Sequence, residues 1–166
     1  MNPNLVSKHL FNTPIESGLR SLFVLDAVSP KECDLQRLVI YDYLLVHSDD
    51  VPTGPAALHP ATPLRSGELL VRRTLVEQGL RLLTRKGLVT RNYTKAGIYF
   101  AATKFAKPFL VYFKSSYALR CGEISKWIAG RFQPLGDDEL REFIHENLGR
   151  WGAEFTRESV LWEEME

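Results

Sequence analysis

The chain has 166 residues, of which 45% are hydrophobic and 25% charged, and its formal net charge is +1. These values are typical of one globular domain, and no apolar run approaches the ~20 residues of a bilayer-spanning helix, which argues against a membrane protein. The charge is unevenly distributed, because residues 61–107 carry ten Lys or Arg and two Glu, whereas residues 1–60 and 108–166 sum to −3 and −4. Such a basic block indicates an anionic partner.

Two helices are predicted in the first third of the chain. The run Thr13-Pro14-Ile15-Glu16 can cap a helix, because Thr and Glu fit a capping box and Pro suits the first turn. Ser29-Pro30 ends this helix. A second helix is predicted from about residue 34 to 46, apolar on more than one side and therefore central. The connection 48–67 holds four of the nine prolines, which favours an extended, stiff backbone.

A third helix and a hairpin follow. The helix is predicted over about residues 68–85, with Ser66 as its N-cap and Lys86-Gly87 as its end. Residues 88–93 and 98–101 have the pattern of two strands joined by a turn. A helix that ends in Lys-Gly-Leu-Val before a basic hairpin is typical of a winged helix-turn-helix. In that fold, this helix is the recognition helix and the hairpin is the wing.

The C-terminal part is predicted to be helical. A short helix begins at Thr103 or Pro108, a longer one is capped by Ser116, and a last one begins at Asp137 or Asp138. We therefore expect a mainly α protein with a small β-hairpin, a winged helix with additional C-terminal helices, over residues 9–150. Residues 151–166 form an acidic tail whose apolar anchors could dock a partner or pack on the helices: Trp151, Phe155, Leu161 and Trp162.

No catalytic motif is recognisable. The chain has no glycine-rich phosphate loop and no nucleophile elbow, and its four histidines are scattered. Cys33 and Cys121 have no close partner at metal-ligand spacing, and the N-terminus lacks the pattern of a signal peptide, so we expect reduced thiols and a cytoplasmic location. We expect no enzyme activity, metal or other cofactor, although an active site assembled from distant residues stays open.

The basic block supplies the candidate interaction residues. Seven cations lie on the predicted recognition helix and wing, where they can contact phosphates, base edges or a protein: Arg72, Arg73, Arg81, Arg85, Lys86, Arg91 and Lys95. The same helix carries a second apolar face formed by Val71, Leu75 and Leu82, which predicts that both sides are covered by protein or by a partner. DNA contact and protein docking both remain open, because winged helices also dock proteins and Arg is enriched at protein interfaces.

Three longer strings are more distinctive: FNTPIESGLR at 11–20, DLQRLVIYDYLLVHS at 34–48 and LHPATPLRSGELLVRR at 58–73. Together, over about residues 9–134, the chain resembles the middle-component family of bacterial ABC-three-component systems, and within it the accessory (LmuC) subunits of Lamassu-type anti-phage and anti-plasmid defence. The resemblance rests on these positions: Asn12, Pro14, Glu16, Arg20, Asp42, His47, His59, Pro60, Arg65 and Ser66.

The resemblance implies a non-catalytic scaffold. Its partners would be an SMC-like ABC ATPase that senses foreign DNA and an effector, often a nuclease, that the scaffold restrains until sensing; DNA contact would occur within the complex. The competing hypothesis is a winged-helix transcriptional regulator, which would be a symmetric dimer with an exposed basic recognition helix. Asp42, His47, His59, Arg65 and Ser66 are not explained by helix capping. The two histidines and Arg65 bracket the proline-rich loop and are predicted to hold it in a buried polar network, with a partner-facing surface as the alternative.

Overall fold

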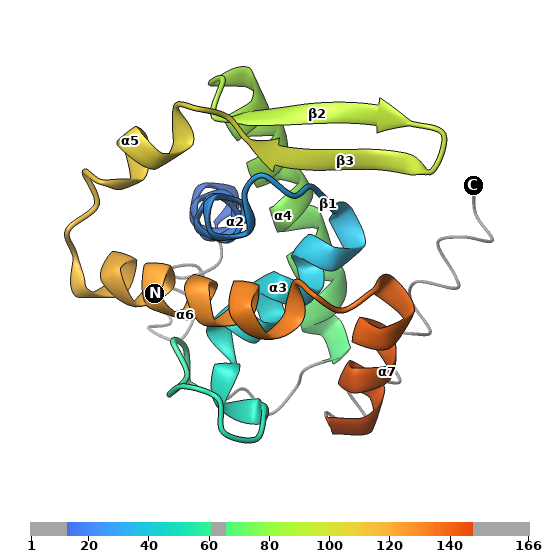
Figure 1. Cartoon of the computed structure of the whole chain (residues 1–166). Coiled ribbons are helices and arrows are strands. Elements are labelled where there is room, and N and C mark those ends of the chain that lie inside the picture. The colour runs from blue at the N-terminus through green and yellow to red at the C-terminus, as the bar shows by residue number, and fades with distance from the viewer. Residues whose placement is uncertain (1–12, 61–65, 148–166) are drawn as a thin grey trace, which may run out of the picture.

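The computed structural model describes residues 13–60 and 66–147, and these residues fold mainly into helices with a small antiparallel sheet (Figure 1). The elements follow in the order α2 (Pro14–Val28), β1 (Cys33–Asp34), α3 (Leu35–Val46), the 3-10 turn η1 (Ser48–Asp50), α4 (Ser66–Arg85), β2 (Val89–Thr94), β3 (Gly97–Ala102), α5 (Ala106–Leu110), α6 (Ser116–Phe132) and α7 (Asp137–Asn147). Among the described residues, no helix combines the length and apolar character needed to cross a bilayer.

The beginnings of α2 and α3 follow local sequence rules. The amide of Glu16 donates to Thr13 Oγ1 at 3.2 Å and the amide of Thr13 donates back to Glu16 Oε2 at 3.2 Å, so the predicted capping box is confirmed. Asp34 caps α3 by accepting from the amide of Arg37 at 2.7 Å. The predicted cap of α6 is wrong by one residue, because Ser115 rather than Ser116 accepts a hydrogen bond from the amide of Ala118.

The sheet has three antiparallel strands in the order β1-β3-β2. The hairpin of β2 and β3 is confirmed, with Thr94 opposite Gly97 at its turn. Gly87 has a φ of +74°, as expected for the left-handed residue that ends α4. Strand β1 was not predicted, and it places Cys33 opposite Phe100. Two residues are too short to show a strand pattern, and only pairing with the distant β3 makes them a strand.

Helix α2 lies in the middle of the molecule, where it packs against α4 and α6 (Figure 1). Its contact with α4 is unusually close because Gly18 and Gly79 face each other. A Cβ added to Gly79 would lie 2.6 Å from the Cα of Gly18 and 2.5 Å from the carbonyl oxygen of Pro14. Neither backbone can give way without moving its helix, so the two glycines set the distance between α2 and α4.

The two apolar faces predicted for α4 differ in how deeply they are buried. Val76 and Leu80 are fully buried and form the face that packs on α2 and α3. On the second face, Leu75 and Leu82 are only partly buried and Val71 is 55% exposed. The described part of the chain therefore covers one side of α4 and leaves the other partly open.

Candidate functional site

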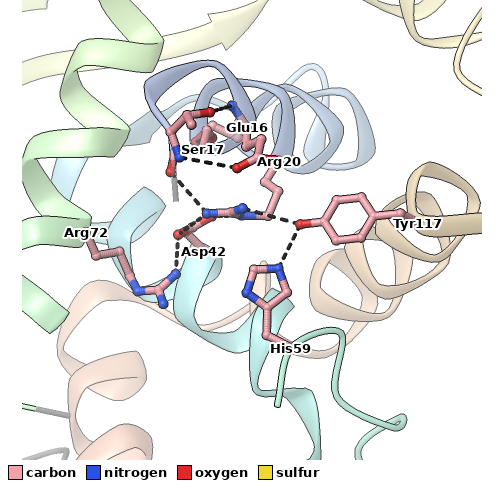
Figure 2. Close-up of polar contacts among 9 residues, drawn as sticks. Glu16, Ser17, Arg20, Asp42, His59, Arg72 and Tyr117 are labelled. Carbon is pink, nitrogen blue, oxygen red and sulfur yellow. Dashed lines mark hydrogen bonds and ion pairs between the residues drawn. The ribbon is translucent and has the colours of Figure 1, made fainter. Parts of the chain in front are cut away.

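A buried charged cluster joins the three helices that form the middle of the fold (Figure 2). Asp42 of α3 accepts hydrogen bonds from Arg20 of α2, at 2.6 Å from Nε and 3.3 Å from Nη2. The other guanidinium belongs to Arg72 of α4, whose Nη1 lies 2.5 Å from Asp42 Oδ2. All three side chains are 5% exposed or less, so one carboxylate ties two cations from different helices together out of contact with water.

The cluster extends to α6 and to the proline-rich loop. Arg20 Nη1 donates to the hydroxyl of Tyr117 on α6 at 3.3 Å, and that hydroxyl lies 2.8 Å from His59 Nε2 (Figure 2). The amide of His59 also donates to the carbonyl of Val46 at the end of α3, at 3.1 Å. The loop around His59 is therefore fixed to α3 by its backbone and to α6 by its side chain.

The charges in the cluster control its protonation. Burial raises the pKa of the Asp42 carboxyl, but Arg20 and Arg72 outweigh burial and bring that pKa down to about 2. Burial, together with the charges of Arg20 and Arg72, lowers the pKa of His59 to about 4. At neutral pH Asp42 is therefore ionised and His59 is uncharged. The Nε of Arg72 has no hydrogen-bond partner among the described residues.

The predicted network around the proline-rich loop is therefore present, but with other members than those expected. Of the three expected members, His59 belongs to it; its carboxylate is Asp42 and its two arginines are Arg20 and Arg72. His47 is 2% exposed, and its ring centre lies 5.1 Å from that of Tyr43.

The other residues on which the family resemblance rests lie outside the buried cluster or outside the described residues. Pro14 and Glu16 belong to the α2 cap, and Pro60 is exposed at the edge of the described loop. Ser66 begins α4, but its side chain is not described. Asn12, Arg65 and the tail anchors Trp151, Phe155, Leu161 and Trp162 lie outside the described residues.

Arg72 was predicted to belong to the basic face, and this prediction is wrong. Its side chain is 5% exposed and points to Asp42, so it cannot contact DNA or a partner from the folded surface. The error had an available signal, because Arg72 lies four residues before Val76 and eight before Leu80 and so falls on the buried face of α4. Arg73 is partly buried and donates to the side-chain carbonyl of Gln36 at 3.1 Å.

The other predicted cations gather at the end of α4 and on the hairpin. We call this group the basic surface, and its exposed members are Arg81, Arg85, Lys86, Arg91 and Lys95. Arg81 forms an exposed ion pair with Glu77 at 3.5 Å, and the guanidinium of Arg91 lies 5.2 Å from the ring centre of Tyr93. No Asp or Glu occurs from residue 78 to residue 122. In the described part of the chain, Glu77 pairs with Arg81 and Glu32 accepts from Asn92 on the hairpin, so the five cations of the basic surface exceed these two acids and suit an anionic partner.

Buried thiols, a cleft and scattered acidic side chains are the described features that bear on reactive chemistry. Burial raises the pKa of both Cys33 and Cys121 to about 12, so each thiol is protonated at neutral pH and a poor nucleophile. A cleft of about 260 Å³ opens between β1 and the α6–α7 connection, lined by residues that include Arg37, Tyr99 and Gln133. Within the described ranges, no three His, Cys, Asp or Glu side chains gather as metal ligands would.

The fold and these surfaces define a class of protein: a small, mainly helical unit with a three-stranded sheet, a buried charged cluster and an exposed basic surface. The family described as ABC-three component (ABC-3C) system Middle Component 2 matches residues 10–154, and the chain belongs to this family. The match extends further toward the C-terminus than the resemblance seen in the sequence. No match was found among curated proteins or among solved structures.

Proposed function

We propose that this chain is the scaffold subunit of a Lamassu-type defence complex. It joins an SMC-like ABC ATPase to an effector, restrains the effector, and releases it when the ATPase senses foreign DNA. The observation that carries this proposal is the family match over residues 10–154, since a middle component is defined by the system in which it works. The role of scaffold is supported by the described surfaces, which offer charge and apolar area to partners.

We further propose that residues 14–102 form a winged helix. The chain order of helix, strand, two helices and two strands, with the sheet order β1-β3-β2, agrees with that fold. In it α4 is the recognition helix and the hairpin of β2 and β3 is the wing. Winged helices serve both as DNA readers and as docking modules, so the fold alone does not decide the partner.

The scaffold acts through contacts and not through catalysis. Its sequence lacks the phosphate loop and the nucleophile motifs of the common enzyme classes. To transmit sensing, it must bind two states of the ATPase with unequal affinity, because a ligand with equal affinity for both states shifts neither. We therefore expect its hold on the effector to weaken when the ATPase engages ATP and DNA.

A second candidate function is a DNA-binding regulator. It is favoured by one specific observation: Gln78, Arg81 and Arg85 are exposed along α4, so this helix keeps a free polar stripe of the kind that enters a major groove. A regulator of this type is a symmetric dimer that binds one short duplex site tightly. A monomeric isolated chain without sequence preference for DNA contradicts this candidate and leaves the scaffold.

The experiment that tests restraint uses the effector as its reporter. The purified effector is assayed for nuclease activity alone, with this chain, and with this chain, the ATPase, ATP and DNA. We expect the chain to suppress cleavage and the complete mixture to restore it. Equal activity of the effector in all three conditions would contradict the proposed function.

A further inference from the structure

The segment from Lys104 to Lys114 carries an exposed apolar group that the fold holds in place. Inward, Ala106 and Leu110 are buried at 0% and 7% exposure, and the ring of Phe109 packs edge-on against that of Phe113 at 5.2 Å. Outward, three large side chains are mostly exposed: Phe105 at 59%, Val111 at 57% and Tyr112 at 84%. They are fixed on a packed backbone, so they present apolar area to the surroundings rather than to the core.

Three lysines stand among these side chains, and we name the group the α5 surface: Lys104, Phe105, Lys107, Val111, Tyr112 and Lys114. All three lysines are exposed, and the ammonium of Lys104 lies 5.2 Å from the ring centre of Phe105. The segment falls within the stretch 78–122 that has no Asp or Glu. In Figure 1, α5 and its connection to α6 lie at the edge of the molecule opposite α7.

We propose that the α5 surface docks an acidic segment of a partner protein that carries large apolar side chains. An apolar centre with charged residues around it is the usual anatomy of a protein interface, and aromatic side chains are enriched there. None of the three lysines forms an ion pair within the described ranges, so acidic groups on a partner would complement their charge. This inference rests on the proposed function, because the partner is one of the two other components of the system.

Two other occupants fit the surface less well. A second copy of this surface would bring lysines against lysines, which costs free energy. Duplex DNA would satisfy the lysines, but its phosphates offer no apolar partner for the aliphatic side chain of Val111. The combination of aliphatic, aromatic and cationic groups therefore favours an acidic protein segment.

The test places a photo-reactive p-benzoylphenylalanine at position 112 of the full chain, assembled with the ATPase and effector of its system. We expect cross-links to one of these two proteins, mapped by mass spectrometry to a stretch rich in Asp or Glu. The same group at position 93 is the matched control, because Tyr93 is also exposed, at 72%, but lies on the hairpin. Position 93 is expected not to yield that cross-link.

A second measurement uses variants whose changes all lie on the outside of the fold. Phe105→Ala combined with Tyr112→Ala, and separately Lys104→Glu combined with Lys107→Glu, should each weaken binding to the partner at least tenfold. Lys31→Glu combined with Lys126→Glu, also on exposed side chains, should leave it unchanged. A thermal melt of each variant confirms that the fold is retained.

The outcomes separate this inference from the proposed function. A complex that forms normally, is insensitive to these variants and yields cross-links only to DNA, to a second copy or to the chain itself overturns the inference and leaves the scaffold intact. If the unmodified chain forms no complex with either component, the proposed function fails and the inference fails with it.

Discussion

Replacement of Asp42 by Asn is the sharpest test of the buried cluster. The change keeps the shape of the side chain but removes the only described carboxylate between Arg20 and Arg72, which leaves two guanidinium charges buried. Loss of one partner from a buried ion pair costs ~3–5 kcal/mol. The lowered pKa of Asp42 indicates a free energy of similar magnitude. A shift from 3.8 to about 2 contributes on the order of 2 kcal/mol of stability, at ~1.4 kcal/mol per pKa unit.

Urea unfolding at pH 7, followed by circular dichroism, measures this loss. Asp137→Asn is the matched control, because Asp137 also pairs with an arginine, Arg37 at 2.9 Å, but its side chain is 52% exposed. An exposed pair contributes ~0–1 kcal/mol. If both variants lose the same small amount of stability, Asp42 does not hold the helices together and the account of the cluster is wrong.

The pH dependence gives a second measurement of the same carboxylate. Its folded pKa of about 2 lies below the unfolded value of 3.8, so its stabilisation is fully present above pH ~4 and is lost as the pH falls toward 2. Asp42→Asn should lack this part of the acid dependence. An unchanged slope in that range would show that another group is responsible.

Three further predictions follow from other contacts. Gly79→Ala should destabilise the fold by ~1–3 kcal/mol because its Cβ meets the backbone of α2, whereas Gly130→Ala, in open space on α6, should gain up to ~1 kcal/mol; equal urea midpoints would contradict the close approach. His59→Gln should flatten the decline of stability between pH 6.5 and 4, because the pKa of His59 is lowered from 6.5 to about 4 and its stabilisation is lost as the pH falls through that range. Arg91→Glu with Lys95→Glu should weaken DNA binding by the assembled complex and reduce its salt dependence without preventing assembly. If fluorescence anisotropy shows unchanged DNA affinity but assembly fails, the basic surface docks protein.

Local signals predicted most of the fold. The cap of α2, the glycine that ends α4 and the turn of the hairpin each depend on neighbouring residues, and each was found where the sequence indicated. The strand β1 depends on a partner far along the chain, so no local pattern marks it. The same limit applies to Gly18 and Gly79, whose importance arises only when α2 and α4 cross.

The candidate sites were predicted in part. An Asp in the apolar helix α3 indicates a buried charge, but its partners lie 22 and 30 residues away, and periodicity cannot pair them. Arg72 carries two conflicting signals, because its charge favours the surface whereas its position on the buried face of α4 favours the core. The α5 surface was overlooked because exposed apolar residues in a short helix resemble core residues until the structure shows which way they point.

The central claim is that this chain works as a component of a larger assembly. The most direct measurement is size-exclusion chromatography of the co-expressed chain, ATPase and effector, with and without ATP and DNA. We expect the three proteins to elute together, and we expect ATP and DNA to change the share of effector that stays bound. If the chain elutes alone in every condition, and cells that lack it still resist phage or plasmid, the scaffold function is contradicted.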